Sequence, residues 1–325
     1  MPNDNLKKTI SLIVPCFNEE KNIEHLYQAV LAVWEELEEK YDYELIFIDD
    51  GSKDNTILEV EKLAKLDDRV LLLEFSRNFG KEMATSAGIN YCSGDAAIMI
   101  DADLQYPIEI LPEFVNKWEQ GNEVVVGVRD AKKTKNIIDK AGSFIFYKII
   151  NAISDIKIES GALDFRLVDR KVINEFNRFT ERGRMTRALI DWLGFKRDYV
   201  RYQEKPRLYG KPAYSFIKRV RLALSTFISQ SLLPLKLAGY LGLFVTIFSG
   251  VTLLTILVTR YIIHNTWGLS ISRAMIVVIA MMFLIGIVLM FLGLISLYIA
   301  NIHVEVANRP IYVIRRLTRK SDLVV

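Results

Sequence analysis

Cysteine and histidine are scarce in this chain of 325 residues, which contains two cysteines and three histidines. The two cysteines, Cys16 and Cys92, are too few for a disulfide framework. The histidines, at positions 25, 264 and 303, are too scattered along the sequence to form a zinc site. The composition therefore argues against a disulfide-stabilised secreted domain and against a zinc protein, and it fits a reducing compartment.

Two glycine-rich phosphate-binding motifs are also absent. The chain contains neither the G-x-G-x-x-G of dinucleotide-binding domains nor the G-x-x-x-x-G-K-[ST] of P-loop proteins. A net charge of +3 gives no indication of a nucleic-acid partner, and we expect none. A dehydrogenase, a P-loop NTPase and a nucleic-acid-binding protein are therefore poor candidates.

Charge is missing from two long segments near the C-terminus. Residues 235–259 contain one charged residue, Lys236, and residues 274–300 contain none. At about 1.5 Å per helical residue, each is long enough to cross a hydrocarbon core of about 30 Å. Buried core helices are the alternative, but core helices of this length normally carry a polar face. We therefore expect two transmembrane helices, at 235–259 and 274–300.

Basic residues beside these segments predict the orientation in the membrane. They precede the first segment and follow the second: Lys218, Arg219, Arg221, Arg309, Arg315, Arg316, Arg319 and Lys320. The short hairpin 260–273 carries only Arg260 and Arg273. The positive-inside rule then places the N-terminal domain and the basic tail 301–325 in the cytoplasm and the hairpin outside. We expect a multi-pass protein of the inner (plasma) membrane.

The stretch that leads into the first segment has a one-sided charge. Residues 205–221 include six Lys or Arg and no acid, and an amphipathic, serine-containing stretch follows, up to Pro234. This pattern is typical of helices that lie on anionic lipid headgroups, and we expect interfacial amphipathic helices at 211–234. A solvated linker is the alternative.

The N-terminal part, residues 1–210, alternates strand-like and helix-like patterns. Apolar, β-rich runs lie at 9–14, 44–48, 70–75, 96–100 and 123–128, and helical patterns lie at 20–40, 56–65, 81–91 and 108–120. This alternation predicts an α/β domain with a mostly parallel sheet and helices on both faces. In such sheets, ligands bind beyond the carboxyl ends of the strands.

Carboxylates collect at those strand ends. Asp101 and Asp103 follow the fourth strand, two residues apart, so an extended chain projects both to the same side. Two hard oxygen ligands can hold Mg²⁺ or Mn²⁺ and leave sites for water and phosphate oxygens. Gln105 is near enough to help orient the ion. A surface turn is the alternative for an isolated D-x-D, but the neighbouring strand-end carboxylates favour a metal.

The ordered set of motifs resembles the family 2 glycosyltransferases of the GT-A fold. The motifs are IVPCFNEE at 13–20, IDDGS at 48–52, SRNFGK at 76–81, DADLQ at 101–105, DFRLVDR at 164–170 and NRPIY at 308–312. Within the family, the chain is similar to enzymes that glycosylate polyprenyl phosphates, such as bactoprenol glucosyltransferase and dolichyl-phosphate mannose synthase. The resemblance implies a Rossmann-like GT-A domain and a metal-dependent hexosyl transfer.

The resemblance also implies a nucleotide-sugar pocket. Its lining would include Pro15, Asn18, Glu19, Asp49, Asp50, Asp101, Ala102 and Gln105. Carboxylates suit such a pocket because sugar hydroxyls and a base N–H are hydrogen-bond donors. Glu19 has an alternative explanation, which is that negative charge is favourable at a helix N-terminus. The segment from Asp50 to Ser52 has one too, since it can simply form a turn.

By the same resemblance, Asp164 lies beside the acceptor and the anomeric carbon. A lipid phosphate is already substantially ionised near neutral pH, so Asp164 would act by positioning rather than as a strong base. A structural pair with Arg166 is the alternative. The cations and the tyrosine expected around the acceptor phosphate are Arg129, Arg166, Arg207, Lys211 and Tyr214. The family usually carries Lys immediately before this tyrosine, whereas this chain has Ala213.

The function implied is inverting transfer of a sugar from a nucleotide sugar to polyprenyl (undecaprenyl) phosphate, with UDP-glucose as the first choice of donor. GDP-mannose or a UDP-amino-arabinose derivative is the alternative donor. A processive polysaccharide synthase is disfavoured because its Q-x-x-R-W motif is absent. The alternative outside the enzymes is a non-catalytic membrane scaffold or lipid-binding protein with the same fold. A homo-oligomer, a downstream flippase and a second glycosyltransferase are the expected partners.

Overall fold

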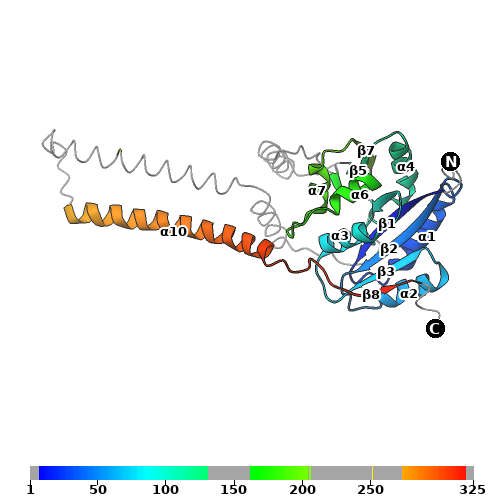
Figure 1. Cartoon of the computed structure of the whole chain (residues 1–325), viewed down its shortest axis with the longest axis horizontal. Helices are drawn as coiled ribbons and strands as arrows, with labels where there is room; N and C mark the ends of the chain where they lie inside the picture. Colours follow the sequence, from blue (N-terminus) through cyan, green and yellow to red (C-terminus); the bar gives the residue numbers. More distant parts are fainter. Residues whose placement is uncertain (1–6, 131–161, 204, 206–250, 252–272, 320–325) are drawn as a thin grey trace. The chain divides into compact units, whose positions relative to one another are not determined.

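The structure is a computed structural model that describes residues 7–130, 162–203, 205, 251 and 273–319 (Figure 1). The chain divides into two compact units, one made of Met1–Ala213 with Arg309–Val325 and the other of Tyr214–Asn308. The first unit therefore contains both ends of the chain. The second unit is an insertion between its two parts.

Strands and helices alternate through the first part of the chain, as the sequence predicts. The elements up to the fifth strand are β1 (Lys8–Cys16), α1 (Ile23–Trp34), β2 (Tyr41–Asp49), α2 (Thr56–Leu66), β3 (Val70–Phe75), α3 (Lys81–Tyr91), β4 (Ala96–Met99), a 3₁₀ turn (Ile108–Ile110), α4 (Leu111–Glu119) and β5 (Val124–Arg129). The later elements are β6 (Ala162–Asp169), α6 (Arg170–Phe176), α7 (Thr186–Trp192), β7 (Arg197–Tyr202), α10 (Arg273–Val306) and β8 (Ile314–Thr318).

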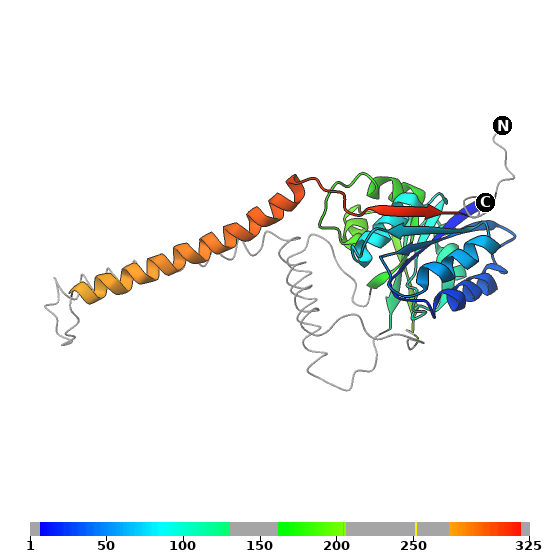
Figure 2. The same cartoon turned by 90° about the horizontal axis from the view of Figure 1, so that it is seen from below.

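The strands form one eight-stranded sheet in the order β7-β5-β6-β4-β1-β2-β3-β8. Its centre, β4-β1-β2-β3, is parallel. Strand β6 is antiparallel to both β4 and β5, and β8 is antiparallel to β3 at the edge (Figure 2). The expected α/β architecture with a mostly parallel sheet is therefore confirmed, with two antiparallel strands that the sequence patterns did not reveal.

Helices cover both faces of the sheet, and each face has its own core (Figure 1). Leu12, Leu45 and Phe47 point to the face covered by α1, α2 and α4. Ile13 and Ile46, one residue along each strand, point to the face covered by α3, α6 and α7. Burial on both faces explains why these strands read as continuous apolar runs rather than as alternating ones.

Helix α1 (Ile23–Trp34) is shorter at both ends than the helical pattern at 20–40. The acidic residues Glu35, Glu36, Glu38 and Glu39 come directly after it. Negative charge is unfavourable at the negative end of a helix dipole, so the chain turns there instead of extending the helix.

Part of the expected membrane region is described. The segment 274–300 lies within α10 (Arg273–Val306), whereas 211–234 and, apart from Val251, 235–259 lie outside the described residues. Within the described part of the chain, no helix has the length and apolar character that crossing a membrane requires. The two expected spans remain predictions.

Candidate functional site

The carboxyl ends of β1, β2 and β4 meet at one edge of the sheet. Cys16 at the end of β1 is in register with Asp49 at the end of β2, and Ile13 is in register with Met99 at the end of β4. The loops that follow these three strands carry the polar motifs of the sequence. They are therefore neighbours in the structure, and we call this edge the candidate site.

The first loop is tied to the loop after β2. Asn18 has a positive φ of 57°, its amide N donates to Ser52 Oγ over 2.9 Å, and its Oδ1 accepts from the amide N of Lys53 over 2.8 Å. The amide N of Glu19 donates to Thr56 Oγ1 over 2.8 Å. Asn18 thus holds these two loops together with its side chain and backbone, and Glu19 does so with its backbone.

The two aspartates at the end of β2 have different surroundings. Asp49 is fully buried, and its Oδ2 accepts from the amide N of Gly51 (3.1 Å) and of Ser52 (3.0 Å). Among the residues that the structure describes, Asp49 Oδ1 has no hydrogen-bond partner. Burial raises the pKa of Asp49. A buried acceptor without a donor is costly, so Oδ1 is suited to a donor brought by a ligand.

Asp50 instead holds the loop after β3. Its carboxylate accepts from the amide N of Phe79 (2.6 Å) and of Gly80 (2.9 Å). Burial raises the pKa of Asp50, and these two donors oppose that rise. Gly51, at φ 72°, has the backbone of Arg77 so close that a Cβ would lie 2.7 Å from its carbonyl carbon. The two loops therefore pack backbone against backbone, which permits no side chain at position 51.

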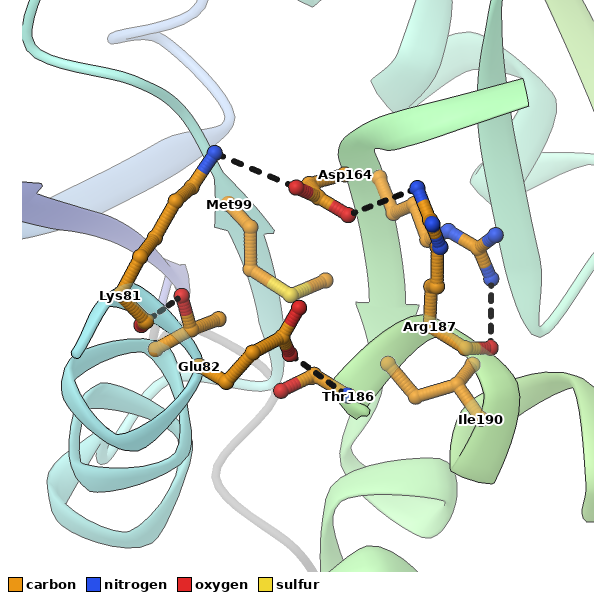
Figure 3. A pocket seen from close by; sticks show the side chains of 9 residues that line it. Lys81, Glu82, Met99, Asp164, Thr186, Arg187 and Ile190 are labelled. Atoms are coloured by element: carbon orange, nitrogen blue, oxygen red, sulfur yellow. Dashed lines mark hydrogen bonds and ion pairs between the residues drawn. The ribbon is translucent and has the colours of Figure 1, made fainter. Parts of the chain in front are cut away.

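A lysine lies between two acidic positions of the site. Lys81 Nζ is 2.6 Å from Asp101 Oδ1. It is also 3.2 Å from Asp164 Oδ2, and Arg187 lies 3.8 Å from Asp164 Oδ1 (Figure 3). Asp101 follows β4 and Asp164 lies in β6, so the antiparallel pairing of these strands brings them together. Asp101 and Asp164 therefore share one cation, Lys81, in the structure.

The charges of this cluster depend on one another. Burial by itself would lower the pKa of Lys81, but Asp101 and Asp164 raise it above its usual range. Burial by itself would raise the pKa of Asp164, but Lys81 and then Arg187 hold it below its usual value. Burial raises the pKa of Asp101, and Lys81 offsets part of that rise. Asp164 is therefore a carboxylate at neutral pH, not a proton donor.

The D-x-D segment is a tight turn behind this cluster. Asp103 is 4% exposed, and its Oδ1 accepts from the amide N of Gln105 over 3.1 Å, with Leu104 at a positive φ of 57°. Ala102 is buried beside it. The stacked rings of Tyr106 and Phe165, 4.8 Å apart, join the end of this turn to β6.

The donor set fits a hard divalent cation that takes further ligands from elsewhere. Burial raises the pKa of Asp101, and the nearby negative charge of Asp103 adds to that rise. Carboxylate oxygens are the ligands that Mg²⁺ and Mn²⁺ prefer. Within the described residues, no group of three or more His, Cys, Asp or Glu side chains is arranged to hold a metal ion. An ion here would therefore depend on water and on phosphate oxygens for its remaining ligands.

Two of the residues expected at the acceptor phosphate, Arg129 and Arg166, lie in strands that the structure describes. Arg166 is 2% exposed, and its guanidinium donates to both carboxylate oxygens of Asp191 over 2.8 and 3.2 Å. This ion pair and a hydrogen bond to the carbonyl oxygen of Arg187 over 3.2 Å give Arg166 a structural role. Arg129 ends β5, which β6 separates from β4. Arg207, Lys211, Ala213 and Tyr214 lie outside the described residues.

A small pocket beside Asp164 contains residues that the sequence reasoning missed. Lys81, Glu82, Thr186 and Arg187 line it together with Asp164 (Figure 3). Glu82 accepts from the amide N of Thr186 over 2.8 Å, which joins α3 to α7. Lys81 closes the SRNFGK motif and could have been singled out there, whereas no sequence signal marks Arg187.

Comparisons with known proteins agree with this geometry. The family described as "Glycosyl transferase family 2" matches residues 11–176. The chain is 38% identical over 306 residues to the uncharacterized glycosyltransferase YkcC of Bacillus subtilis (strain 168), which covers 94% of this chain and 93% of that protein. It is 41% identical over 236 residues to a prophage bactoprenol glucosyl transferase homolog of Escherichia coli (strain K12), covering 73% and 76%.

A bactoprenol glucosyl transferase of Shigella phage SfV is 40% identical over 240 residues, covering 74% of this chain and 78% of that one. Among solved structures, a glucosyl-3-phosphoglycerate synthase from Mycobacterium tuberculosis in complex with Mn²⁺, UDP and glucosyl-3-phosphoglycerate is similar at 17% identity and a TM-score of 0.46, covering 69% of this chain and 80% of that one. The extent of the family match and the identity to these relatives show that the chain belongs to glycosyl transferase family 2.

Proposed function

We propose that this protein transfers a hexose, in the first instance glucose from UDP-glucose, to undecaprenyl phosphate with inversion at the anomeric carbon. The observation that carries the proposal is the junction of Asp101, Lys81 and Asp164 at the strand edge that also holds Asp49. Relatives at 40 and 41% identity are named bactoprenol glucosyl transferase and its homolog, which supports the lipid acceptor and the sugar.

Asp49 would recognise the nucleotide. Its buried Oδ1 is an acceptor without a donor among the described residues, and a ribose hydroxyl or a base N–H supplies one. The loop of Asn18 and Glu19 forms the neighbouring wall. A hydrogen bond from the nucleotide would offset part of the free-energy cost of burying the Asp49 carboxylate at the end of β2.

In the reaction, an oxygen of the lipid phosphate attacks the anomeric carbon, the bond from that carbon to the donor diphosphate breaks, and the nucleoside diphosphate leaves. A divalent cation held by Asp101 and Asp103 would neutralise the charge that develops on the leaving diphosphate. Asp164 is ionised and partly exposed, so it can orient a sugar hydroxyl or the attacking group. No proton has to be removed from an acceptor that is already an anion.

The membrane location is part of this proposal. It is supported by the apolar segments 235–259 and 274–300, by the basic stretch 205–221 and by the basic residues of the tail. We propose an inner (plasma) membrane protein with its catalytic domain in the cytoplasm. A flippase and a second glycosyltransferase would then have to move and use the product on the other side, and contacts between membrane helices could form a homo-oligomer.

The test is transfer of radiolabelled glucose from UDP-glucose to undecaprenyl phosphate by the full-length protein in detergent. Mg²⁺, Mn²⁺ and EDTA are compared, and Asp103→Ala is compared with Asp42→Ala, a matched change at an exposed position at the start of β2. We expect metal-dependent label in the lipid phase, a loss of about 100-fold or more in Asp103→Ala, and none in the control.

The same assay is repeated with other nucleotide sugars to identify the sugar that is transferred. Transfer only from GDP-mannose or a UDP-amino-arabinose derivative would keep the reaction and correct the sugar. Absence of transfer from every donor, in a protein that still unfolds cooperatively, would contradict the proposal and favour a non-catalytic scaffold or lipid-binding role.

A further inference from the structure

Lys81 contacts both carboxylate oxygens of Asp101, a residue that would bind a divalent cation. Its Nζ is 2.6 Å from Asp101 Oδ1, and an octahedral ion such as Mg²⁺ lies about 2.1 Å from such an oxygen. The same ammonium group is 3.2 Å from Asp164 Oδ2 (Figure 3). An ion on Asp101 and an ammonium at this position would be two cations within a few ångströms of each other. The described arrangement and a metal-loaded one therefore require different positions of Lys81.

The acidic cluster explains why a cation is present at this point. The cluster consists of Asp101, Asp103 and Asp164, and Lys81 Nζ lies 2.6 Å from Asp101 Oδ1 and 3.2 Å from Asp164 Oδ2. Lys81 is the cation that contacts two of these carboxylates, Asp101 and Asp164. Arg187 lies 3.8 Å from the other oxygen of Asp164, Oδ1. Like charges close together repel, so carboxylates in a cluster need a counter-ion. Lys81 offsets the negative charge of Asp101 and Asp164 in the described structure.

The surroundings of Lys81 allow its side chain to move without the backbone. It is the first residue of α3, after Gly80, and its side chain is 39% exposed. The preceding loop is held in place by Asp50. A flexible four-carbon side chain on a fixed backbone can change its anionic partner by rotation alone. A diphosphate entering the site brings such a partner.

We propose that Lys81 is a resident counter-ion that competes with the divalent cation for Asp101, and that a nucleoside diphosphate releases it, so that nucleotide and metal bind cooperatively. This inference depends on the proposed function. It gives Lys81 a role in the order of assembly: the site stays neutralised by the protein until a nucleotide arrives, and only then binds the metal tightly. By linkage, metal and nucleotide each tighten binding of the other by the same factor.

The test is a titration of the full-length protein in detergent with Mn²⁺, followed by electron paramagnetic resonance, with and without UDP. Lys81→Met removes the charge, and Lys81→Gln removes the charge but keeps a hydrogen-bond donor for Asp164. We expect both variants to bind Mn²⁺ without UDP about tenfold more tightly than the wild type, within the range usual for coupled sites. The tightening by UDP should shrink in both variants, and some should remain because phosphates also ligate the ion.

The controls are Lys81→Arg and Lys62→Met. Arg keeps the positive charge, so its nucleotide-free Mn²⁺ affinity should stay near that of the wild type. Lys62 is an exposed lysine on α2 that pairs with Glu59 at 2.7 Å. Lys62→Met therefore removes the same charge as Lys81→Met, but away from the candidate site. Thermal unfolding of each variant shows whether it is folded, and Lys81→Gln serves if Lys81→Met is not.

Two results would overturn the inference. One is a nucleotide-free Mn²⁺ affinity in the charge-removing variants that equals the wild type, with weaker UDP binding, since Lys81 would then be a phosphate ligand only. The other is Mn²⁺ binding in the wild type that UDP does not tighten. Failure of the proposed function has a separate signature: the wild type would bind neither UDP nor UDP-glucose, whatever residue stands at position 81.

Discussion

Adjacent residues with the same side chain have different roles at the end of β2. Asp50 is saturated by two backbone donors from the loop after β3, whereas Asp49 keeps one buried oxygen without a donor. Local geometry, and not chemical type, separates a residue that holds a loop from one that can hold a ligand. A substitution at Asp50 is therefore a matched control for the same substitution at Asp49, and the reverse also holds.

We predict that Asp49→Asn weakens UDP binding by about tenfold, because an amide nitrogen at the Oδ1 position cannot accept the ligand's hydrogen bond. Its thermal stability should change little, because the remaining amide oxygen still accepts from Gly51 and Ser52. UDP affinity by calorimetry and the melting temperature measure the two effects. Unchanged UDP affinity would remove Asp49 from the nucleotide site.

We predict the opposite division for Asp50→Asn. Its amide replaces one of the oxygens that accept from Phe79 and Gly80, so the variant should lose about 1 to 3 kcal/mol of unfolding free energy. Any loss of UDP affinity should follow from the loosened loop. A variant as stable as the wild type in denaturant titrations would show that these two hydrogen bonds contribute little.

At the scale of elements, Asp67 joins three of them. It lies at the end of α2 and accepts from Tyr27 on α1 over 3.0 Å, from Tyr43 on β2 over 3.2 Å and from the Arg69 side chain over 2.8 Å. Burial by itself would raise the pKa of Asp67, but the hydrogen bonds from Arg69 and Tyr27 lower it to about 2. The ionised form is thus preferred in the folded state.

The pH dependence follows from this direction. A carboxylate with a depressed pKa contributes stability above its unfolded pKa, near 3.9, and that contribution is lost as the pH falls towards 2. We predict that Asp67→Asn costs about 2 kcal/mol at pH 7 and that its difference from the wild type shrinks between pH 4 and pH 2. Unfolding at several pH values measures this, with exposed Asp42→Asn as the control. A difference independent of pH would contradict it.

The last strand is held to the sheet by aromatic and ionic contacts. Tyr312 stacks on Phe75 at 5.2 Å and accepts from Asn90 over 2.8 Å, and Arg316 pairs with Glu61 and Glu74. We predict that Tyr312→Ala costs about 2 kcal/mol of unfolding free energy, whereas Val313→Ala, at an exposed neighbour, costs little. Equal melting temperatures for the two variants would show that β8 is a marginal addition to the sheet.

At the scale of the whole molecule, β8 joins the segment after the insertion to the sheet of the first unit. Residues 214–308 are inserted between two parts of one unit, and β8 pairs with β3, so strands from both parts belong to the same sheet. We predict that reporters fused to the N-terminus and to the C-terminus in living cells report the same compartment. Green fluorescent protein and alkaline phosphatase fusions test this, and opposite sides for the two termini would be incompatible with the β3–β8 pairing.

The sequence by itself predicted the parallel part of this fold. The strands expected at 70–75 and 96–100 are found at Val70–Phe75 and Ala96–Met99, and the helix expected at 81–91 is α3 (Lys81–Tyr91). These elements were predictable because burial on both faces and helical spacing leave strong local patterns. The carboxylate positions followed from them, since parallel strands share one carboxyl edge.

Only the tertiary structure decided the pairing of β6 and β8 and the partners within the site. Lys81 meets Asp101 and Asp164, residues 20 and 83 positions away, through the packing of α3 against two strands. Arg166 pairs with Asp191, which lies 25 residues away in the sequence. Local patterns carry burial and periodicity but not the direction of a side chain across a sheet. The identity of the charged residues was therefore readable in the sequence, and their roles depended on which charges the fold brought within 4 Å.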